Sequence, residues 1–525
     1  YCGKPAKAQR ILASKIKKNK EKAAINIIMD NTTPRRGGQD ILCCFRKYYE
    51  NLYKSETNKL DKQTIVSYFD QLKIASVTET QNESLTKNIS QTEIIKTIDN
   101  GKLGKCPGED GYTYEFYKDY KHLIVPVLHR VFNKVLQTGK WPETWRNAII
   151  TVIAKEGKDP KQCASYRPIS LLNVDQKIFT SIMANRLSDI LPCIINLDQT
   201  GFVKNKFLSD NVRRTLDIID YSIKTKQQML VLTLDAEKAF DRVSWPFLFA
   251  VLNRFGFHKK FINLMMGMYN DSAARVKANG SLSKPFQIKR GVKQGDPLSP
   301  QIFALCIEQL AECIRTSMGI KGIKIQDEEH KLALYADDVI VFLTDIYNSL
   351  PALLEEIGKY GAISGYKLNS TKTEAMEIGC NLQTEFKKRF KLKWDQNKIK
   401  YLGITIPKEI DKLYSFNYKV LETSLKQDLM RWKILPLTIF EKIGIIKMNA
   451  LPRFLFFFQN LPLYLTSSCF REWEKMLGKF IWDEKKPRVK LKFLQQNREQ
   501  GGLGLPNLSL YYHAAQVKKH SNIDE

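Results

Sequence analysis

The sequence predicts an α+β protein that contains about two to four structural units. Its 525 residues are too many for one core, because single hydrophobic cores stop growing at about 250–300 residues. The hydrophobic content of 43% excludes a disordered chain, which lacks the apolar residues that offset ordering entropy. In the middle of the chain, short apolar runs alternate with helical patterns, and the pattern after about residue 410 is helical.

The strands are predicted from three apolar runs. Residues 229–234 (MLVLTL) are continuously apolar, as expected of a strand that is buried on both faces. Residues 332–335 and 339–343 are two shorter runs. Ala336, Asp337 and Asp338 lie between them, which predicts a tight hairpin.

Two helices are predicted between these strands. The first begins after Ser244, a suitable N-cap, and ends at Gly256. The second opens at Ser299 and Pro300, because proline is favoured in the first turn of a helix.

The charge predicts a polyanionic partner. The chain has 83 Lys and Arg against 55 Asp and Glu, a formal charge of +28, which is typical of nucleic-acid binding; a merely solubilising surface is the alternative. Basic residues cluster at 1–22, 387–400 and 485–498. The ten cysteines are scattered without a metal-binding spacing, so we expect no zinc site and an intracellular location, in the nucleus or the cytoplasm. No apolar run is long enough to predict a membrane span.

Two acidic sites each adjoin an apolar strand. Asp235 follows the first run, and Asp337 and Asp338 lie between the two later runs. Carboxylates at the ends of adjacent strands can converge, and their mutual repulsion then implies bound cations. Oxygen ligands suit Mg²⁺, and two such ions can support an in-line phosphoryl transfer. An isolated Asp-Asp pair would more often be a polar turn.

Several motifs then occur in a recognisable order. They are LDAEKAFD (234–241), GVKQGDPLSP (291–300), YADD (335–338) and YLGI (401–404), with PGEDG (107–111), YRPISL (166–171), DQTGF (198–202), FIW (480–482) and GGLGLP (501–506) around them. From about residue 40 to its end, the chain resembles the reverse transcriptases of non-LTR retrotransposons. More specifically, it looks like the second open reading frame product of vertebrate LINE-one-clade elements. This product normally has an endonuclease before this region and a Cys-rich segment after it, so we expect a fragment.

The resemblance implies a right-hand polymerase with an antiparallel palm sheet and a helical thumb. The implied parts are a basic, mostly helical N-terminal extension (1–92), fingers with part of the palm (93–230), the palm with the primer grip (231–406), and the thumb with the start of a C-terminal region (407–525). The implied activity is RNA-directed DNA synthesis from a primer 3′-OH with two Mg²⁺ ions, or Mn²⁺ in their place. The implied partners are an RNA template, a DNA primer or nicked target DNA, and dNTPs.

The resemblance also implies a role for each motif residue. Asp235, Asp337 and Asp338 match the catalytic metal ligands, with the carbonyl of Ala236 as a further ligand. The other matches are Phe240 beneath the incoming sugar, Gln294 and Gly295 at the nascent base pair and template, Arg167 and Lys155 on the triphosphate, Lys372 as the proton donor to pyrophosphate, and Tyr401, Leu402 and Gly403 as the primer grip. Glu237 and Asp241 are interpreted as members of structural ion pairs.

The sequence leaves three alternative functions. Two are enzymatic, an intron maturase and an RNA-dependent RNA polymerase; Phe240 argues against RNA synthesis, because a ribonucleotide needs room for its 2′-OH. The third is a catalytically decayed element copy that only binds nucleic acid. All three aspartates are present, which favours intact chemistry.

Overall fold

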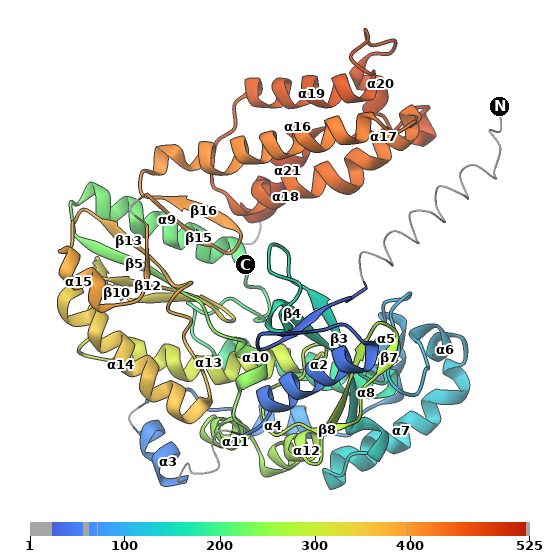
Figure 1. Ribbon diagram of the computed structural model, residues 1–525, viewed down its shortest axis with the longest axis vertical. Helices are drawn as coiled ribbons and strands as arrows, with labels where there is room; N and C mark the ends of the chain where they lie inside the picture. The colour runs from blue at the N-terminus through green and yellow to red at the C-terminus, as the bar shows by residue number, and fades with distance from the viewer. Residues whose placement is uncertain (1–23, 56–61, 71, 396, 521–525) are drawn as a thin grey trace. The chain divides into compact units, whose positions relative to one another are not determined.

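The computed structural model describes residues 24–55, 62–70, 72–395 and 397–520 (Figure 1). The basic arm predicted for residues 1–22 lies outside these described residues. The chain forms two compact units of mixed helices and strands, so the predicted α+β class is confirmed. The first unit comprises Tyr1–Lys204, Ala236–Ser317 and Leu353–Leu368, and the second comprises Asn205–Asp235, Met318–Ala352 and Asn369–Glu525.

The first unit is mostly helical. Its helices are α2 (Gly38–Leu52), α3 (Lys62–Asp70), α4 (Glu79–Thr86), α5 (Gln91–Asp99), α6 (Tyr114–Asp119), α7 (Lys121–Thr138), α8 (Val174–Ile194), α10 (Ala239–Arg242), α11 (Trp245–Arg254), α12 (Lys259–Tyr269) and α13 (Ser299–Thr316). α14 (Ile346–Ser364) begins in the second unit and ends in the first. α11 and α13 begin after Ser244 and at Ser299, as the sequence predicts.

A mixed sheet in the first unit packs against α2. Its strands are β3 (Asn147–Ala154), β4 (Tyr166–Leu171), β6 (Ala273–Ala278), β7 (Ser281–Leu282) and β8 (Phe286–Gln287), and a separate hairpin is formed by β1 (Ile28–Asp30) and β2 (Thr33–Arg35). β3 is antiparallel to β4 and parallel to β6. α2 buries Phe45 and Tyr49 in the core that it shares with this sheet. This apolar face fixes the helix on the sheet, because its burial is the main stabilising term.

The second unit is built on a five-stranded sheet. The strand order is β11 (Leu332–Tyr335), β12 (Asp338–Leu343), β5 (Met229–Leu234), β13 (Glu374–Ile378) and β14 (Lys393–Trp394). All neighbours are antiparallel except β13 and β14. β5 lies in the middle of the sheet and is buried over nearly its whole length, as its apolar run predicts.

The second unit contains further helices and short strands outside this sheet. They are α9 (Leu208–Lys224), β9 (Ile323–Ile325), β10 (Glu328–His330), α15 (Thr384–Arg389), β15 (Lys398–Tyr401), β16 (Ile404–Pro407), α16 (Val420–Lys433), α17 (Ile439–Ile445), α18 (Leu451–Asn460), α19 (Ser467–Ile481), α20 (Leu491–Gln495) and α21 (Leu508–His520). α9 packs on β11 and β13.

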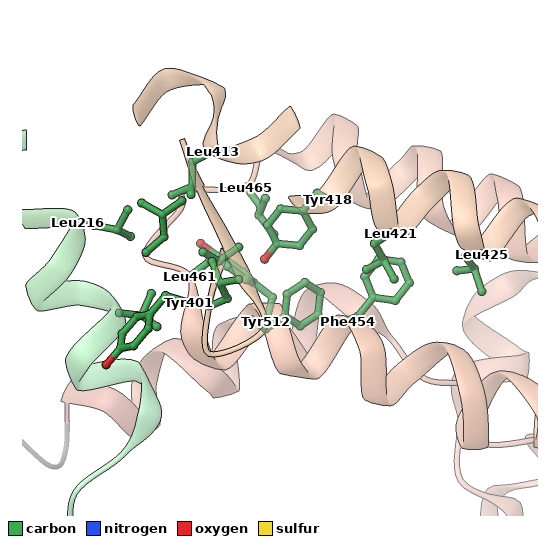
Figure 2. Packing of buried hydrophobic residues seen from close by; sticks show 14 of the residues in the cluster. Leu216, Tyr401, Leu413, Tyr418, Leu421, Leu425, Phe454, Leu461, Leu465 and Tyr512 are labelled. Carbon is green, nitrogen blue, oxygen red and sulfur yellow. The ribbon is translucent and has the colours of Figure 1, made fainter. Parts of the chain in front are cut away.

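One apolar core joins the sheet, α9 and the C-terminal helices of this unit. Figure 2 shows Tyr401 of the β15–β16 hairpin, Tyr418, Phe454 of α18 and Tyr512 of α21 in this cluster. Trp473 of α19 is almost fully buried in the same cluster. The core therefore holds the β15–β16 hairpin between the sheet and the helices. Within the described residues, the structure contains no helix that is both long and apolar enough to cross a membrane.

Candidate active site

The register of the central sheet places two of the predicted catalytic aspartates side by side. β5 and β12 are antiparallel, and Leu234 at the end of β5 pairs with Val339 near the start of β12. Asp235 follows Leu234, and Asp338 precedes Val339. The two carboxylates therefore extend from neighbouring strands at the same edge of the sheet.

The third predicted aspartate lies in the turn that joins β11 to β12. Tyr335 pairs with Asp338, which leaves Ala336 and Asp337 as the two turn residues of a tight hairpin. Ala336 adopts a φ of 56°, the left-handed conformation that such two-residue turns use at their first position. It is also buried, so a small side chain suits this turn.

A cleft of about 570 Å³ opens over these strand ends. Asp235 and Asp338 line it, with Leu208, Thr233, Leu234, Tyr335, Val339, Thr371, Lys372, Glu374, Lys393, Lys400, Tyr401, Leu402 and Gly403. Lys372 and the turn 401–403 were predicted from separate motifs. The structure thus brings both of them into one cleft with Asp235 and Asp338.

The loop that carries Lys372 is tied to the backbone of Asp235. The Asn369 amide donates to the Asp235 carbonyl at 2.8 Å, and the Asp235 amide donates to the Thr373 hydroxyl at 3.4 Å. This attachment places Lys372 Nζ 3.3 Å from an oxygen of the Asp235 carboxylate. An ammonium group therefore lies beside the strand-ending carboxylate.

The carboxylates at the strand ends repel one another. The pKa of Asp338 is raised to about 6, first by desolvation and then by the negative charges of Asp337 and Asp235. Solvent still reaches the Asp338 side chain. A cation that enters from solvent would relieve this repulsion.

The donor set fits a divalent cation that also binds phosphate. Carboxylate oxygens are preferred ligands of Mg²⁺, which commonly uses one or two of them and completes its shell with water and phosphate oxygens. Asp235 and Asp338 supply two such groups. Among the residues that the structure describes, no group of three or more His, Cys, Asp or Glu side chains could hold a metal ion by itself. The remaining ligands of a cation here would thus come from elsewhere, such as water or substrate.

The predicted primer grip is the tight turn between β15 and β16. Tyr401 pairs with Ile404, and the turn residues Leu402 and Gly403 have φ angles of 49° and 80°. Gly403 is required in this turn, because a side chain would be strained at this φ and its Cβ would lie 3.2 Å from the Phe456 ring. Tyr401 is buried, which anchors the turn beside the cleft.

Phe240 belongs to the first unit, as does Ala236, since the boundary between the units falls directly after Asp235. Phe240 is half-buried. Its ring stacks on Phe303 at a centroid distance of 4.4 Å and meets Phe202 edge-on at 6.3 Å. Phe240 is thus held by two aromatic contacts and is still partly exposed.

Arg167 and Lys155 lie on the β3–β4 hairpin. Arg167 is exposed and pairs with Ile153 across the hairpin. Lys155 Nζ donates to the Ala164 carbonyl at 3.1 Å. The guanidinium is therefore the more accessible of the two predicted phosphate contacts.

Gln294 and Gly295 lie in the loop ahead of α13, and this loop is bound to β4. The Ser170 amide donates to the Gln294 carbonyl at 2.8 Å. Gly295 has a φ of 111°, and a Cβ there would lie 2.7 Å from the Ser170 carbonyl oxygen, so only glycine fits. The loop is thereby held close to the strand that carries Arg167.

The sequence did not single out two lysines that line the cleft. Lys393 of β14 and Lys400 of β15 belong to the basic run 387–400, which was interpreted only as a nucleic-acid signal. A sequence pattern could have identified Lys400, because it alternates with the apolar residues Ile399 and Tyr401. In the structure these two residues are buried and Lys400 is exposed. No comparable signal exists for Lys393, whose strand is two residues long.

Comparisons with known proteins identify a family and several similar proteins. Residues 153–406 match the family model described as reverse transcriptase (RNA-dependent DNA polymerase). The chain is 29% identical over 468 residues to the Transposon TX1 uncharacterized 149 kDa protein of Xenopus laevis, which covers 89% of this chain and 35% of that protein. It is 26% identical over 406 residues to the Pol polyprotein from the type-1 retrotransposable element R2 of Popillia japonica, covering 73% and 53%. It is 28% identical over 256 residues to the RNA-directed DNA polymerase from the mobile element jockey of Drosophila melanogaster, covering 48% and 27%.

The mixed fold and the paired carboxylates in an open cleft suit a nucleic-acid polymerase domain. Residues 153–406 match the reverse transcriptase family, and the predicted resemblance to the RNA-directed DNA polymerases of non-LTR retrotransposons is confirmed. The chain spans between about a quarter and about half of the length of these three relatives.

Proposed function

We propose that this chain is an RNA-directed DNA polymerase that adds dNTPs to a primer 3′-OH on an RNA template. The observation that carries the proposal is the pairing of Leu234 with Val339, because it sets Asp235 and Asp338 side by side in an open cleft. The family of residues 153–406 supports the same reaction class.

Asp235 and Asp338 are the residues that would hold divalent cations, with Asp337 and the Ala236 carbonyl as further candidates. When bound, such ions would lower the pKa of the primer hydroxyl and compensate the charge of the leaving pyrophosphate. Lys372 would hold a proton at Nζ beside Asp235 and supply it to the pyrophosphate, because its ammonium already lies next to this carboxylate. The turn 401–403 lines the cleft and would support the primer end.

We assign the five-stranded sheet of the second unit to the palm and its C-terminal helices to the thumb. In the first unit, residues 93–204 would belong to the fingers with part of the palm, and residues 236–317 to the palm. In that unit, Arg167 would bind the triphosphate, Phe240 would limit the sugar to deoxyribose, and Gln294 and Gly295 would contact the nascent base pair. These roles follow from the motif positions, and the exposure of Arg167 and the partial exposure of Phe240 suit them.

Primer extension tests the proposal. A DNA primer annealed to an RNA template should be extended with dNTPs and Mg²⁺, should stop with a chelator, and should resume when excess Mg²⁺ or Mn²⁺ is added. No product from a folded, monodisperse sample that still binds the duplex would overturn the proposal. The chain would then only bind nucleic acid.

A further inference from the structure

A buried carboxylate in the first unit links the N-terminal helix α2 to the Gln294 loop. Asp241 is 2% exposed and follows Phe240 in the LDAEKAFD motif. The Tyr53 hydroxyl donates to one of its oxygens at 2.8 Å, and the Gln294 side-chain amide donates to the other at 3.1 Å. Tyr53 is 188 residues away from Asp241 in the sequence. One acid thus joins two segments that the motifs do not connect.

The Tyr53 end of this link is held by several contacts. Tyr53 caps the C-terminus of α2 and is 6% exposed, and its ring stacks on Tyr49 at 6.2 Å. The Lys289 amide donates to the Tyr53 carbonyl at 3.0 Å, and Arg290 Nε donates to the Leu52 carbonyl. The end of α2 therefore holds both the Asp241 carboxylate and the residues that lead into the Gln294 loop.

The Gln294 end is held at two points. Its carbonyl accepts from the Ser170 amide, and its side-chain amide is bound by Asp241. The loop starts at Gly291, where a Cβ would lie 2.7 Å from the Asp241 carbonyl oxygen, so the two backbones are in close contact. The side chain of Gln294 is only half-buried. Its orientation is thus set by Asp241, while part of it remains accessible.

We propose that Asp241 is a positioning residue. It orients the side chain of Gln294 toward the incoming nucleotide and its template base, and it fixes the Gln294 loop to the end of α2. The proposal deepens the function proposed above and rests on it, because it requires Gln294 to contact the nascent base pair. It adds to the interpretation of Asp241 as an ion-pair member, since its hydrogen-bond donors are a hydroxyl and an amide, while the charges of Lys238 and Lys155 also favour its ionised carboxylate. Glu237, which was interpreted in the same way, does lie 3.1 Å from Lys367 in an ion pair.

A packing role would not need a carboxylate at this position. Burying a charged acid is costly, and burial raises the pKa of Asp241 to about 6, against the effect of its hydrogen bond from Tyr53. Asparagine has almost the same shape and is neutral, so it would satisfy a packing role at least as well. When its oxygen accepts from Tyr53, however, the atom that faces Gln294 is an amide nitrogen, so Gln294 can keep this contact only with its own amide turned over, which exchanges the positions of Nε2 and Oε1.

Steady-state dNTP incorporation by the Asp241→Asn, Gln294→Ala and double variants tests the proposal. We expect Asp241→Asn to raise the KM for dNTP about fivefold, the fold-change that corresponds to one ordinary hydrogen bond, with template affinity and melting temperature unchanged. Gln294→Ala should have a similar effect, and the double variant should be no worse than Gln294→Ala alone, because Asp241 acts through Gln294. Tyr53→Phe should shift KM in the same direction. Asp175→Asn, which removes a carboxylate that accepts from Trp145 in the same unit, is the matched control and should leave KM unchanged.

The outcomes separate this proposal from the proposed function. Additive effects of Asp241→Asn and Gln294→Ala, or a normal KM in Asp241→Asn alone, would overturn the positioning role and leave the polymerase assignment intact. A normal KM in Gln294→Ala would show that Gln294 does not contact the nascent pair, and both that assignment and the positioning role would then fail. Loss of extension in the wild type would overturn the proposed function itself.

Discussion

At the scale of single residues, Phe240 offers the sharpest test of substrate choice. It lies five residues after Asp235, and its half-buried ring rests on Phe303. A planar ring at this position leaves room for a 2′-hydrogen and clashes with a 2′-hydroxyl. A clash of about 2–3 kcal/mol corresponds to roughly 30- to 150-fold discrimination. Phe240→Val should therefore raise rNTP incorporation while dNTP incorporation falls only modestly.

A variant of a core phenylalanine shows whether Phe240 selects the sugar or only packs in the core. Phe255, a fully buried ring at the end of α11, is the matched control. Phe255→Val should lower the melting temperature, because a cavity in a core costs about 1–3 kcal/mol, and should leave the sugar preference unchanged. Single-nucleotide kinetics with dNTP and rNTP give the readout. A parallel loss of both substrates in Phe240→Val would place Phe240 in the core instead.

Arg167 tests the triphosphate contact. Arg167→Ala should raise the dNTP KM more than it weakens template binding, because guanidinium groups bind phosphate oxygens in a bidentate way. Arg275→Ala on β6 of the same sheet is the control, since this exposed arginine is paired with Glu109 at 3.3 Å. A titration of dNTP at saturating template distinguishes the two roles. Lost template affinity with an unchanged KM would assign Arg167 to the template.

At the scale of elements, the basic segment 485–498 predicts a nucleic-acid contact outside the cleft. Its six Lys and Arg residues are all exposed, and no acidic residue lies among them. Each phosphate that a cation neutralises adds about −0.9 to the slope of log K against log salt for duplexes. Replacing Lys485, Lys486, Arg488 and Lys490 with Gln should make this slope shallower by up to about 3.6.

A control with the same change in net charge tests whether position matters. Lys224, Lys359, Lys412 and Lys433 each form an ion pair in the structure. Their replacement by Gln should change the salt slope of primer–template binding much less, because these ammonium groups are already paired with carboxylates. Equal changes in both quadruple variants would mean that the segment contributes only through the total charge.

The elements that carry the site could largely be predicted from local patterns. The strand 229–234, the hairpin around Ala336 and the starts of α11 and α13 agree with the apolar runs and capping residues. The link between Asp241 and Tyr53 could not be predicted, because neither residue carries a periodic or motif signal for a partner 188 positions away. The entry of Lys393 into the cleft is likewise a consequence of the parallel β13–β14 pairing, which is two residues long and has no sequence signature.

At the scale of the whole molecule, each unit holds its own part of the proposed chemistry. The second unit contains Asp235, Asp338 and Lys372 in one cleft, whereas the first unit contains Phe240 and Gln294. The charge of +28 is spread over both, which suits a partner as long as a template–primer duplex.

The most direct measurement of the central claim is single-turnover extension by the Asp338→Asn variant on an RNA template. Loss of a cation ligand should remove several kcal/mol of transition-state stabilisation, which is roughly a thousandfold in rate per 4 kcal/mol. Asp345→Asn, at an exposed acid in the bend after β12, is the control and should extend normally. We predict that Asp338→Asn binds primer–template with nearly unchanged affinity and yields almost no product. Near-normal extension by this variant would contradict the assignment of the paired carboxylates as the catalytic centre.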